Sequence, residues 1–140
     1  IKAIVETFYD VMSEQEPALA RLSETEWIAV IRGEDSVQMS RTRSRDAGRT
    51  WDAPVDLEEG RVAPDLVQMR NGLLACSYGR PASCLMFSLD QGDTWSSHHV
   101  ISERVHFNYA AIREISPGRL LYVHDAPELN AVYIDVERAK

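Results

Sequence analysis

The sequence contains little cysteine, no long apolar run and a deficit of positive charge. Lysine and arginine number 15 against 22 aspartates and glutamates, and the net charge of −7 argues against a nucleic-acid or anionic-membrane partner. No apolar run reaches the length of a membrane span, and no signal peptide is recognisable. The chain opens at Ile1 rather than at methionine, which leaves open the loss of an upstream segment.

The only cysteines are Cys76 and Cys84, which fall in neighbouring predicted strands. A disulfide between neighbouring strands is possible but geometrically demanding. The pattern therefore favours two buried free thiols, and it leaves the redox compartment and the localisation open.

An eight-residue pattern occurs twice and organises the rest of the chain. Residues 44–51 read SRDAGRTW and residues 88–95 read SLDQGDTW, so both follow S-x-D-x-G-x-T-W. The aspartates of the two copies, Asp46 and Asp90, are 44 residues apart. A turn repeated at this interval is typical of a repeat protein.

The residue types of the pattern suit a tight turn between strands. Aspartate accepts hydrogen bonds from backbone N–H groups further along a turn, and glycine supplies a position with positive φ. Threonine adds a hydroxyl group, and the tryptophan buries a large ring as the next strand begins.

Short β-rich segments recur around the two turns. We expect strands at 17–22, 27–32, 37–44 and 51–57, then at 64–69, 73–78, 84–88 and 95–101, and finally at 109–115, 119–124 and 131–136. Asn71 and Gly72 form the strongest hairpin signal. The third unit has no copy of the eight-residue pattern.

This spacing predicts an all-β propeller made of about three four-stranded blades. The predicted units are 15–58, 62–102 and 108–140, and residues 1–14 would be the outer strand of a preceding blade. The 140 residues are expected to form a single partial domain. Propellers typically have about 4–8 blades, so either further blades are missing or a second copy completes a six-bladed ring.

The eight-residue pattern resembles the Asp-box of the sialidase (neuraminidase) superfamily, which closes the hairpin between the third and fourth strands of a blade. The resemblance implies a sialidase-like propeller, of which this chain would be the C-terminal half. Asp-boxes also occur in propellers without catalytic activity, so this pattern indicates the fold more strongly than the function.

Strand polarity separates the Asp-boxes from the other unusual residues. If the first strand of each blade starts at one rim, the Asp-boxes lie at the opposite rim and are structural. Glu16, Arg32, Arg80 and Tyr109 then share the first rim.

The segments around these four residues are similar to the active-site segments of exo-sialidases. The similar segments are 16–32 with Glu16 and Arg32, 78–88 with Arg80, and 108–122 with Tyr109. The resemblance implies that Tyr109 is the nucleophile, that Glu16 is its base, and that the two arginines hold the carboxylate of a sialoside or another glycan. Separately, the adjacent His98 and His99 would point to opposite faces of a strand and the sequence has no further His/Cys/carboxylate spacing, so we expect no metal site, and we expect no cofactor.

The same resemblance limits what this chain does alone. The family's first arginine of the triad and its acid/base aspartate belong to the N-terminal half, and no residue here is assigned those roles. We therefore expect no hydrolysis without the missing blades.

Simpler interpretations of these residues stay open. Tyr109 could pack with its hydroxyl satisfied, Glu16 could be a solvated carboxylate, and the arginines could pair with nearby acidic residues. The possible partners are Glu34, Asp35 and Asp125, and the alternative guanidinium groups are those of Arg70 and Arg104. His106 and His124 could approach the same rim.

Two other functions remain as alternatives to a sialidase. One is a non-catalytic propeller that binds carbohydrate or protein. The other is a propeller glycosidase with two carboxylates, for which Asp125 is the one carboxylate at a matching position. Arg41 and Arg43 are expected to lie on a solvated strand face, and Trp27, Trp51 and Trp95 are expected to pack between blades.

Overall fold

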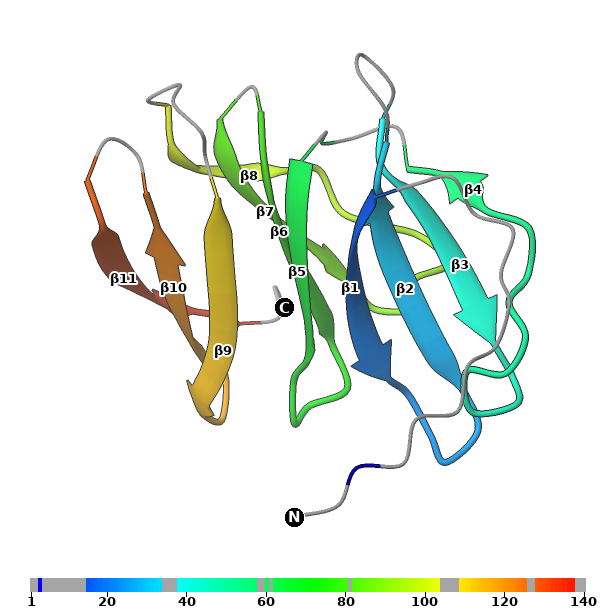
Figure 1. The fold of residues 1–140 in the computed structure, drawn as a ribbon. Helices are drawn as coiled ribbons and strands as arrows, with labels where there is room; N and C mark the ends of the chain where they lie inside the picture. Colours follow the sequence, from blue (N-terminus) through cyan, green and yellow to red (C-terminus); the bar gives the residue numbers. More distant parts are fainter. Residues whose placement is uncertain are drawn as a thin grey trace.

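The computed structural model describes eleven strands in three antiparallel sheets (Figure 1). The described residues are 3, 15–33, 38–57, 60, 62–80, 82–103, 109–125 and 128–137. These residues contain no helix, and therefore no helix long and apolar enough to cross a membrane. The strand predicted within residues 1–14 lies outside the described residues.

Each sheet is formed by consecutive strands of the chain. The first sheet contains β1 (Gln15–Arg21), β2 (Trp27–Arg32), β3 (Ser40–Ser44) and β4 (Val55–Asp56), in that order. The second contains β5 (Val62–Gln68), β6 (Leu74–Gly79), β7 (Ser83–Ser88) and β8 (His99–Ser102). The third contains β9 (Ala110–Ser116), β10 (Arg119–His124) and β11 (Asn130–Asp135).

Two sheets have the expected four strands, whereas the third has three in the part of the chain that the structure describes. The last strand of each four-stranded sheet is also shorter than predicted. β4 covers only Val55–Asp56, where a strand over 51–57 was expected. Pro54 lacks the N–H that a continuous ladder needs, and this accounts for the late start of the strand.

The first strands of the three sheets lie side by side in the order β1, β5, β9 (Figure 1). All sheets are antiparallel meanders, so the starts of β1, β5 and β9 share one edge with the ends of β2, β6 and β10. We call this the upper edge. The two Asp-boxes follow β3 and β7 at the opposite, lower edge, where Ala47 N–H donates to the carbonyl of Thr25.

Two apolar clusters hold the three sheets together. The cluster between the first and second sheets includes Ile28, Val30, Leu74, Tyr78 and Met86, all essentially buried. The cluster between the second and third sheets includes Leu73, Leu85, Ile112, Leu120 and Tyr122. Facing side chains from consecutive sheets thus stabilise a row of sheets through burial of apolar surface.

Both cysteines are free and buried, as the sequence favoured. Cys76 lies in β6 and Cys84 in β7, but they are not opposite one another, because Cys76 faces Met86 across the ladder. Burial in the apolar cluster raises the pKa of the Cys76 thiol, so this group packs as a small hydrophobic side chain.

The two Asp-boxes have the same hydrogen bonds. In the first, the Asp46 carboxylate accepts from the Thr50 N–H (2.8 Å) and hydroxyl (2.7 Å), and Gly48 N–H donates to the Ser44 hydroxyl (2.8 Å). In the second box Asp90, Thr94, Gly92 and Ser88 repeat these bonds at 2.6 to 2.9 Å. The predicted turn chemistry is therefore confirmed.

These hydrogen bonds make the stability of the protein sensitive to acid. Bonds from Thr50 lower the pKa of Asp46 to about 2, and bonds from Thr94 do the same for Asp90, from an ordinary value of 3.8. Because the folded pKa is the lower one, the contribution to stability is complete above pH 4 and is lost as the pH falls toward 2. We expect the free energy of unfolding, from urea titrations at several pH values, to decline over this window.

An Asp46→Asn/Asp90→Asn variant provides the control for the acid effect. It should be less stable at neutral pH and should show a shallower decline below pH 4. An unchanged slope in this variant would assign the acid sensitivity to other carboxylates.

The glycines of the two boxes differ in their surroundings, although both have positive φ. Gly48 has φ +87°, and an added Cβ would meet nothing closer than Trp51 Cζ2 at 3.9 Å. Gly92 has φ +92°, and its Cβ would overlap the Cδ1 of Ile28, which is fully buried. The second box is therefore wedged against the first sheet.

We expect Gly92→Ala to destabilise the fold by about 2–4 kcal/mol, because it combines a strained φ with overpacking against Ile28. Gly48→Ala is the matched control. It should lower the free energy of unfolding only by the strain of a positive φ at alanine, about 1–2 kcal/mol. Chemical denaturation of both variants measures the difference. Equal losses would show that Ile28 moves aside without cost.

Candidate functional site

A hollow of about 440 Å³ lies on the upper edge, where β1, β5 and β9 begin. Its polar side chains are Glu16, Asp65, Tyr109 and Arg113, and its other walls are alanines and prolines of the same three strands. The hollow thus brings Glu16 of the first sheet and Tyr109 of the third to one cavity.

Glu16 is held in a defined position by two partners. Its Oε1 accepts from Arg32 Nη1 at 2.8 Å, and its Oε2 accepts from the backbone N–H of Ala63 at 3.1 Å. The β1–β2 register shifts between Gln15 and Pro17, so Glu16 is the extra residue of a β-bulge and has φ +52°. A bulge of this kind re-aims a side chain, and here it directs Glu16 toward Ala63 in the next sheet.

The same distortion recurs one sheet further on. Ala63 precedes Pro64 as Glu16 precedes Pro17, lies at the register shift in β5, and has φ +49°. Positive φ costs a non-glycine residue about 1–2 kcal/mol. Strained backbone of this kind is concentrated at functional sites, so these two residues favour a functional site at the upper edge.

Tyr109 is anchored through its backbone, and the residue is 44% exposed. Its N–H donates to Asp125 Oδ1 at 2.8 Å, and the Asp125 N–H donates to the Tyr109 carbonyl at 3.3 Å. Asp125, which the sequence suggested as a partner for arginine, instead fixes the start of β9. The tyrosine ring therefore projects from a defined backbone position.

The two arginines of the predicted site are placed differently. Arg32, at the end of β2, forms the ion pair with Glu16. Arg80 follows β6 at the same edge, is half-buried and has φ +56°. Among the described residues, Arg80 has no ion pair and does not line the hollow. The structure thus joins Arg32 to Glu16 and leaves Arg80 separate.

Sequence reasoning missed two polar residues of the hollow, Asp65 and Arg113. Asp65 Oδ2 accepts from the Ile112 N–H at 2.8 Å and from Arg113 Nη1 at 2.7 Å. Asp65 therefore links the second sheet to the third, as Glu16 links the first to the second. The available signal was the Pro64-Asp65 pair, which follows Ala63 at the repeat position of Glu16.

Of the remaining candidates, His124 lies at the upper edge, where it is opposite Ala110 across the ladder, Arg70 lies at the lower edge, and the others are not described. Arg70 lies in the β5–β6 turn at the lower edge, where its N–H donates to Glu114 at 2.8 Å. His124 is buried at the end of β10, next to Tyr122. Glu34, Asp35, Arg104 and His106 lie outside the described residues. No group of three or more potential metal ligands is found in the described part of the chain.

The hollow combines groups suited to binding a polar ligand. A carboxylate held by a guanidinium group keeps acceptor lone pairs for a further donor, since each oxygen has two. A phenol exposed at the same cavity can donate a proton to such an acceptor. Arg113, whose side chain is 68% exposed, adds a cation at the margin.

Comparison with solved structures shows the fold. The chain is similar to the Hadza microbial sialidase Hz136, with a TM-score of 0.71 and 18% identity, over 87% of this chain and 27% of that one. It is also similar to a protein of unknown function from Dyadobacter fermentans, with a TM-score of 0.68 and 16% identity, over 88% of this chain and 38% of that one. The fold is therefore all-β and sialidase-like.

Comparison of sequences adds one distant relative. A region of 101 residues is 32% identical to the vacuolar protein sorting/targeting protein 10 of Eremothecium gossypii. The match includes 66% of this chain but only 6% of that protein. No family model matches the chain. The chain thus spans 6% of that protein and 27% and 38% of the two solved structures.

Proposed function

We propose that this chain is the C-terminal half of a six-bladed sialidase-like propeller and contributes to a glycoside hydrolase of exo-sialidase type. The observation that carries the proposal is the upper-edge hollow, in which Glu16, held by Arg32, shares one cavity with Tyr109. The similarity in fold to a microbial sialidase supports it.

In this proposal Tyr109 is the nucleophile and Glu16 is its base. A phenol has an ordinary pKa near 10 and is a poor nucleophile until a neighbouring group accepts its proton. Sialic acid carries a carboxylate on its anomeric carbon, which would repel an anionic carboxylate nucleophile. Sialidases with a tyrosine nucleophile are known exceptions among glycosidases.

Arg32 and Arg80 would bind the substrate carboxylate. Planar guanidinium groups hold carboxylates through charge-assisted and often bidentate hydrogen bonds. Arg80, which has no ion pair among the described residues, is free to take this role, whereas Arg32 would share its guanidinium between Glu16 and the substrate. The first arginine of the triad and the acid/base aspartate would come from blades outside this chain.

A fluorogenic sialoside tests the proposal on the full-length gene product. Release of the fluorophore with retention of configuration at the anomeric carbon is the expected result. If folded protein releases no fluorophore over a broad range of pH, the glycosidase function is refuted.

The second candidate is a non-catalytic propeller that binds carbohydrate or protein. It is favoured by the relative from Eremothecium gossypii, whose name describes sorting and targeting rather than glycoside hydrolysis. Under this alternative the upper-edge hollow would bind a ligand without turnover. Binding of a sialoside that survives unchanged would support it.

A further inference from the structure

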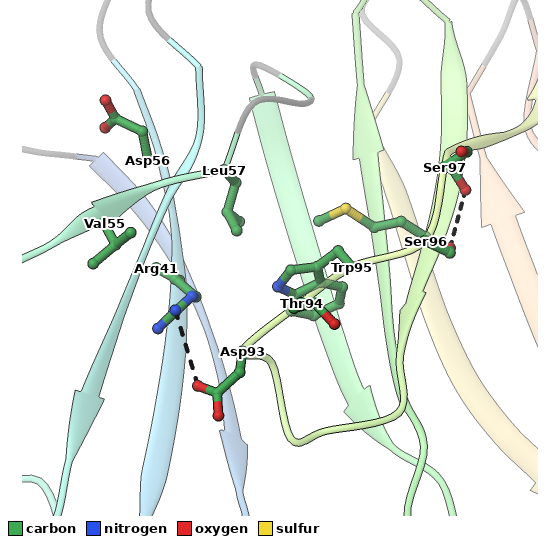
Figure 2. Close-up of a pocket in the computed structure, with 10 residues that line it drawn as sticks. Arg41, Val55, Asp56, Leu57, Asp93, Thr94, Trp95, Ser96 and Ser97 are labelled. Atoms are coloured by element: carbon green, nitrogen blue, oxygen red, sulfur yellow. Dashed lines mark hydrogen bonds and ion pairs between the residues drawn. The ribbon is translucent and has the colours of Figure 1, made fainter.

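A second cavity lies between the first and second sheets, away from the upper-edge hollow (Figure 2). One wall is formed by Arg41 of β3 and the segment 55–57, and the other by the segment 93–97, which includes the end of the second Asp-box. The cavity has a volume of about 470 Å³ and shares no lining residue with the hollow. We call it the intersheet groove.

The groove exists because the second Asp-box packs onto the first sheet. Arg43 Nη2 donates to the Gln91 carbonyl at 2.6 Å and to Asp93 Oδ1 at 3.0 Å, which pins the box to β3. After Trp95, the last residue of the box, the chain continues through Ser96 and Ser97, and the groove lies between this segment and β4. Arg41 of the groove wall and its neighbour Arg43 are the β3 arginines that the sequence analysis had placed on a solvated face. That prediction is wrong, since the side chains of Arg41 and Arg43 are only 18% and 10% exposed.

Trp95 and Arg41 each present a donor at the groove. The indole Nε1 of Trp95 is buried and has no hydrogen-bond partner among the described residues, whereas Trp51 Nε1 in the first box donates to the Gly48 carbonyl at 3.2 Å. Arg41 comes no closer than 3.9 Å to Asp93 Oδ1, an oxygen that Arg43 already holds. In Figure 2 the indole nitrogen lies on the side facing Arg41. Buried donors are nearly always satisfied in proteins, so the indole N–H of Trp95 points to a ligand oxygen as its acceptor, with the Arg41 guanidinium available beside it.

The acceptors and the charge of the groove restrict the ligand further. Asp56 and Asp93 are both exposed at the margin, and their carboxylates can accept from hydroxyl groups. Arg41, Asp56 and Asp93 are the charged residues that line the groove, and Asp93 is also paired with Arg43 from β3. The charges therefore nearly cancel, and the groove offers little net attraction to an ion. Its apolar floor of Trp95, with Leu57 and Met86, suits the apolar face of a ring.

We propose that the intersheet groove binds a neutral pyranose residue of a glycan. Arg41 and the Trp95 indole N–H would donate to ring or hydroxyl oxygens, and Asp56 and Asp93 would accept from hydroxyls. The volume is within the range of small-ligand pockets, about 300–1,000 Å³. This site is independent of the upper-edge hollow, so either proposal can fail without the other.

Calorimetric titration of the full-length gene product with methyl β-D-galactoside, methyl β-D-glucoside and N-acetylglucosamine tests the site. We expect at least one to bind with millimolar affinity, and we expect D-glucuronate to bind no more tightly than its neutral counterpart. Absence of binding by all three neutral sugars, or clear preference for glucuronate, overturns the proposal.

Variants distinguish the groove from any other sugar site on the protein. Arg41→Gln and Trp95→Phe should each weaken binding by about tenfold, because each removes a donor while keeping a polar or an aromatic side chain at the position. Arg45→Gln and Trp51→Phe are matched controls, since Arg45 pairs with the exposed Asp52 and Trp51 bonds within its own box. Thermal melts establish that each variant is folded. If Trp95→Phe does not fold, the result for Arg41→Gln alone tests the proposal. Binding unchanged in folded Arg41→Gln, or equally weakened in the controls, overturns the proposal.

Discussion

Replacing Tyr109 by phenylalanine in the full-length gene product is expected to reduce kcat on a fluorogenic sialoside by at least about 10³-fold. The change removes only the hydroxyl oxygen, which in the proposed mechanism attacks the anomeric carbon. The backbone bonds of Tyr109 with Asp125 do not involve the side chain of residue 109, so the start of β9 should be unaltered. The assay compares initial rates at saturating substrate.

Tyr133→Phe is the matched control for this experiment. Tyr133 lies in β11, is 67% exposed and does not line the upper-edge hollow. Its replacement should leave kcat within about twofold and should have little effect on thermal stability. Full activity of Tyr109→Phe would exclude Tyr109 as the nucleophile, and equal losses in the two variants would point to a general effect on folding.

The parts of the structure that follow from local chemistry could be predicted from the sequence. The Asp-boxes could be predicted because the bonds of Asp46 and Asp90 run to residues only four positions away. The strands 27–32 and 119–124 match β2 and β10, since each combines β-branched or aromatic residues with clear turns at both ends. Strand alternation then correctly assigned the Asp-boxes and the starts of the first strands to opposite edges.

The parts that depend on contacts between sheets could not be predicted in the same way. Arg41 and Arg43 alternate with Thr42, a pattern typical of a solvated face, but Arg43 bonds to Gln91 and Asp93, which are about 50 residues away in the chain. Burial of an arginine depends on the arrival of such a partner, and nothing in the local sequence signals it.

The same difficulty applies to the candidate site. The sequence assigned Glu16, Arg32 and Tyr109 to one edge but gave no sign of the bulge that directs Glu16 to Ala63. Asp65 was missed because its partners, Ile112 and Arg113, belong to the next sheet. Register shifts and contacts between sheets set the finer geometry of this edge, and a single-sequence pattern contains neither.

The ion pair of Glu16 makes its replacement a sharp test of the proposed mechanism. Glu16 accepts from two donors, and each donates to a different carboxylate oxygen. Arg32 Nη1 donates to Oε1, and the Ala63 N–H donates to Oε2. Glutamine offers one acceptor oxygen and one NH₂ group, so one of these donors would face another donor. Glutamine also cannot take the phenolic proton of Tyr109.

Glu16→Gln is therefore expected to lower kcat by about 10²–10⁴-fold, the usual effect of removing a general base. Glu114→Gln is the matched control, because Glu114 also accepts two hydrogen bonds, from the N–H groups of Arg70 and Gly118, but at the lower edge. Both variants should lose stability to urea, since each leaves a donor without its acceptor, yet only Glu16→Gln should lose activity. Retention of kcat within tenfold in folded Glu16→Gln would remove Glu16 from the mechanism and leave it a structural role, as the partner of Arg32 within the first sheet and of Ala63 in the second.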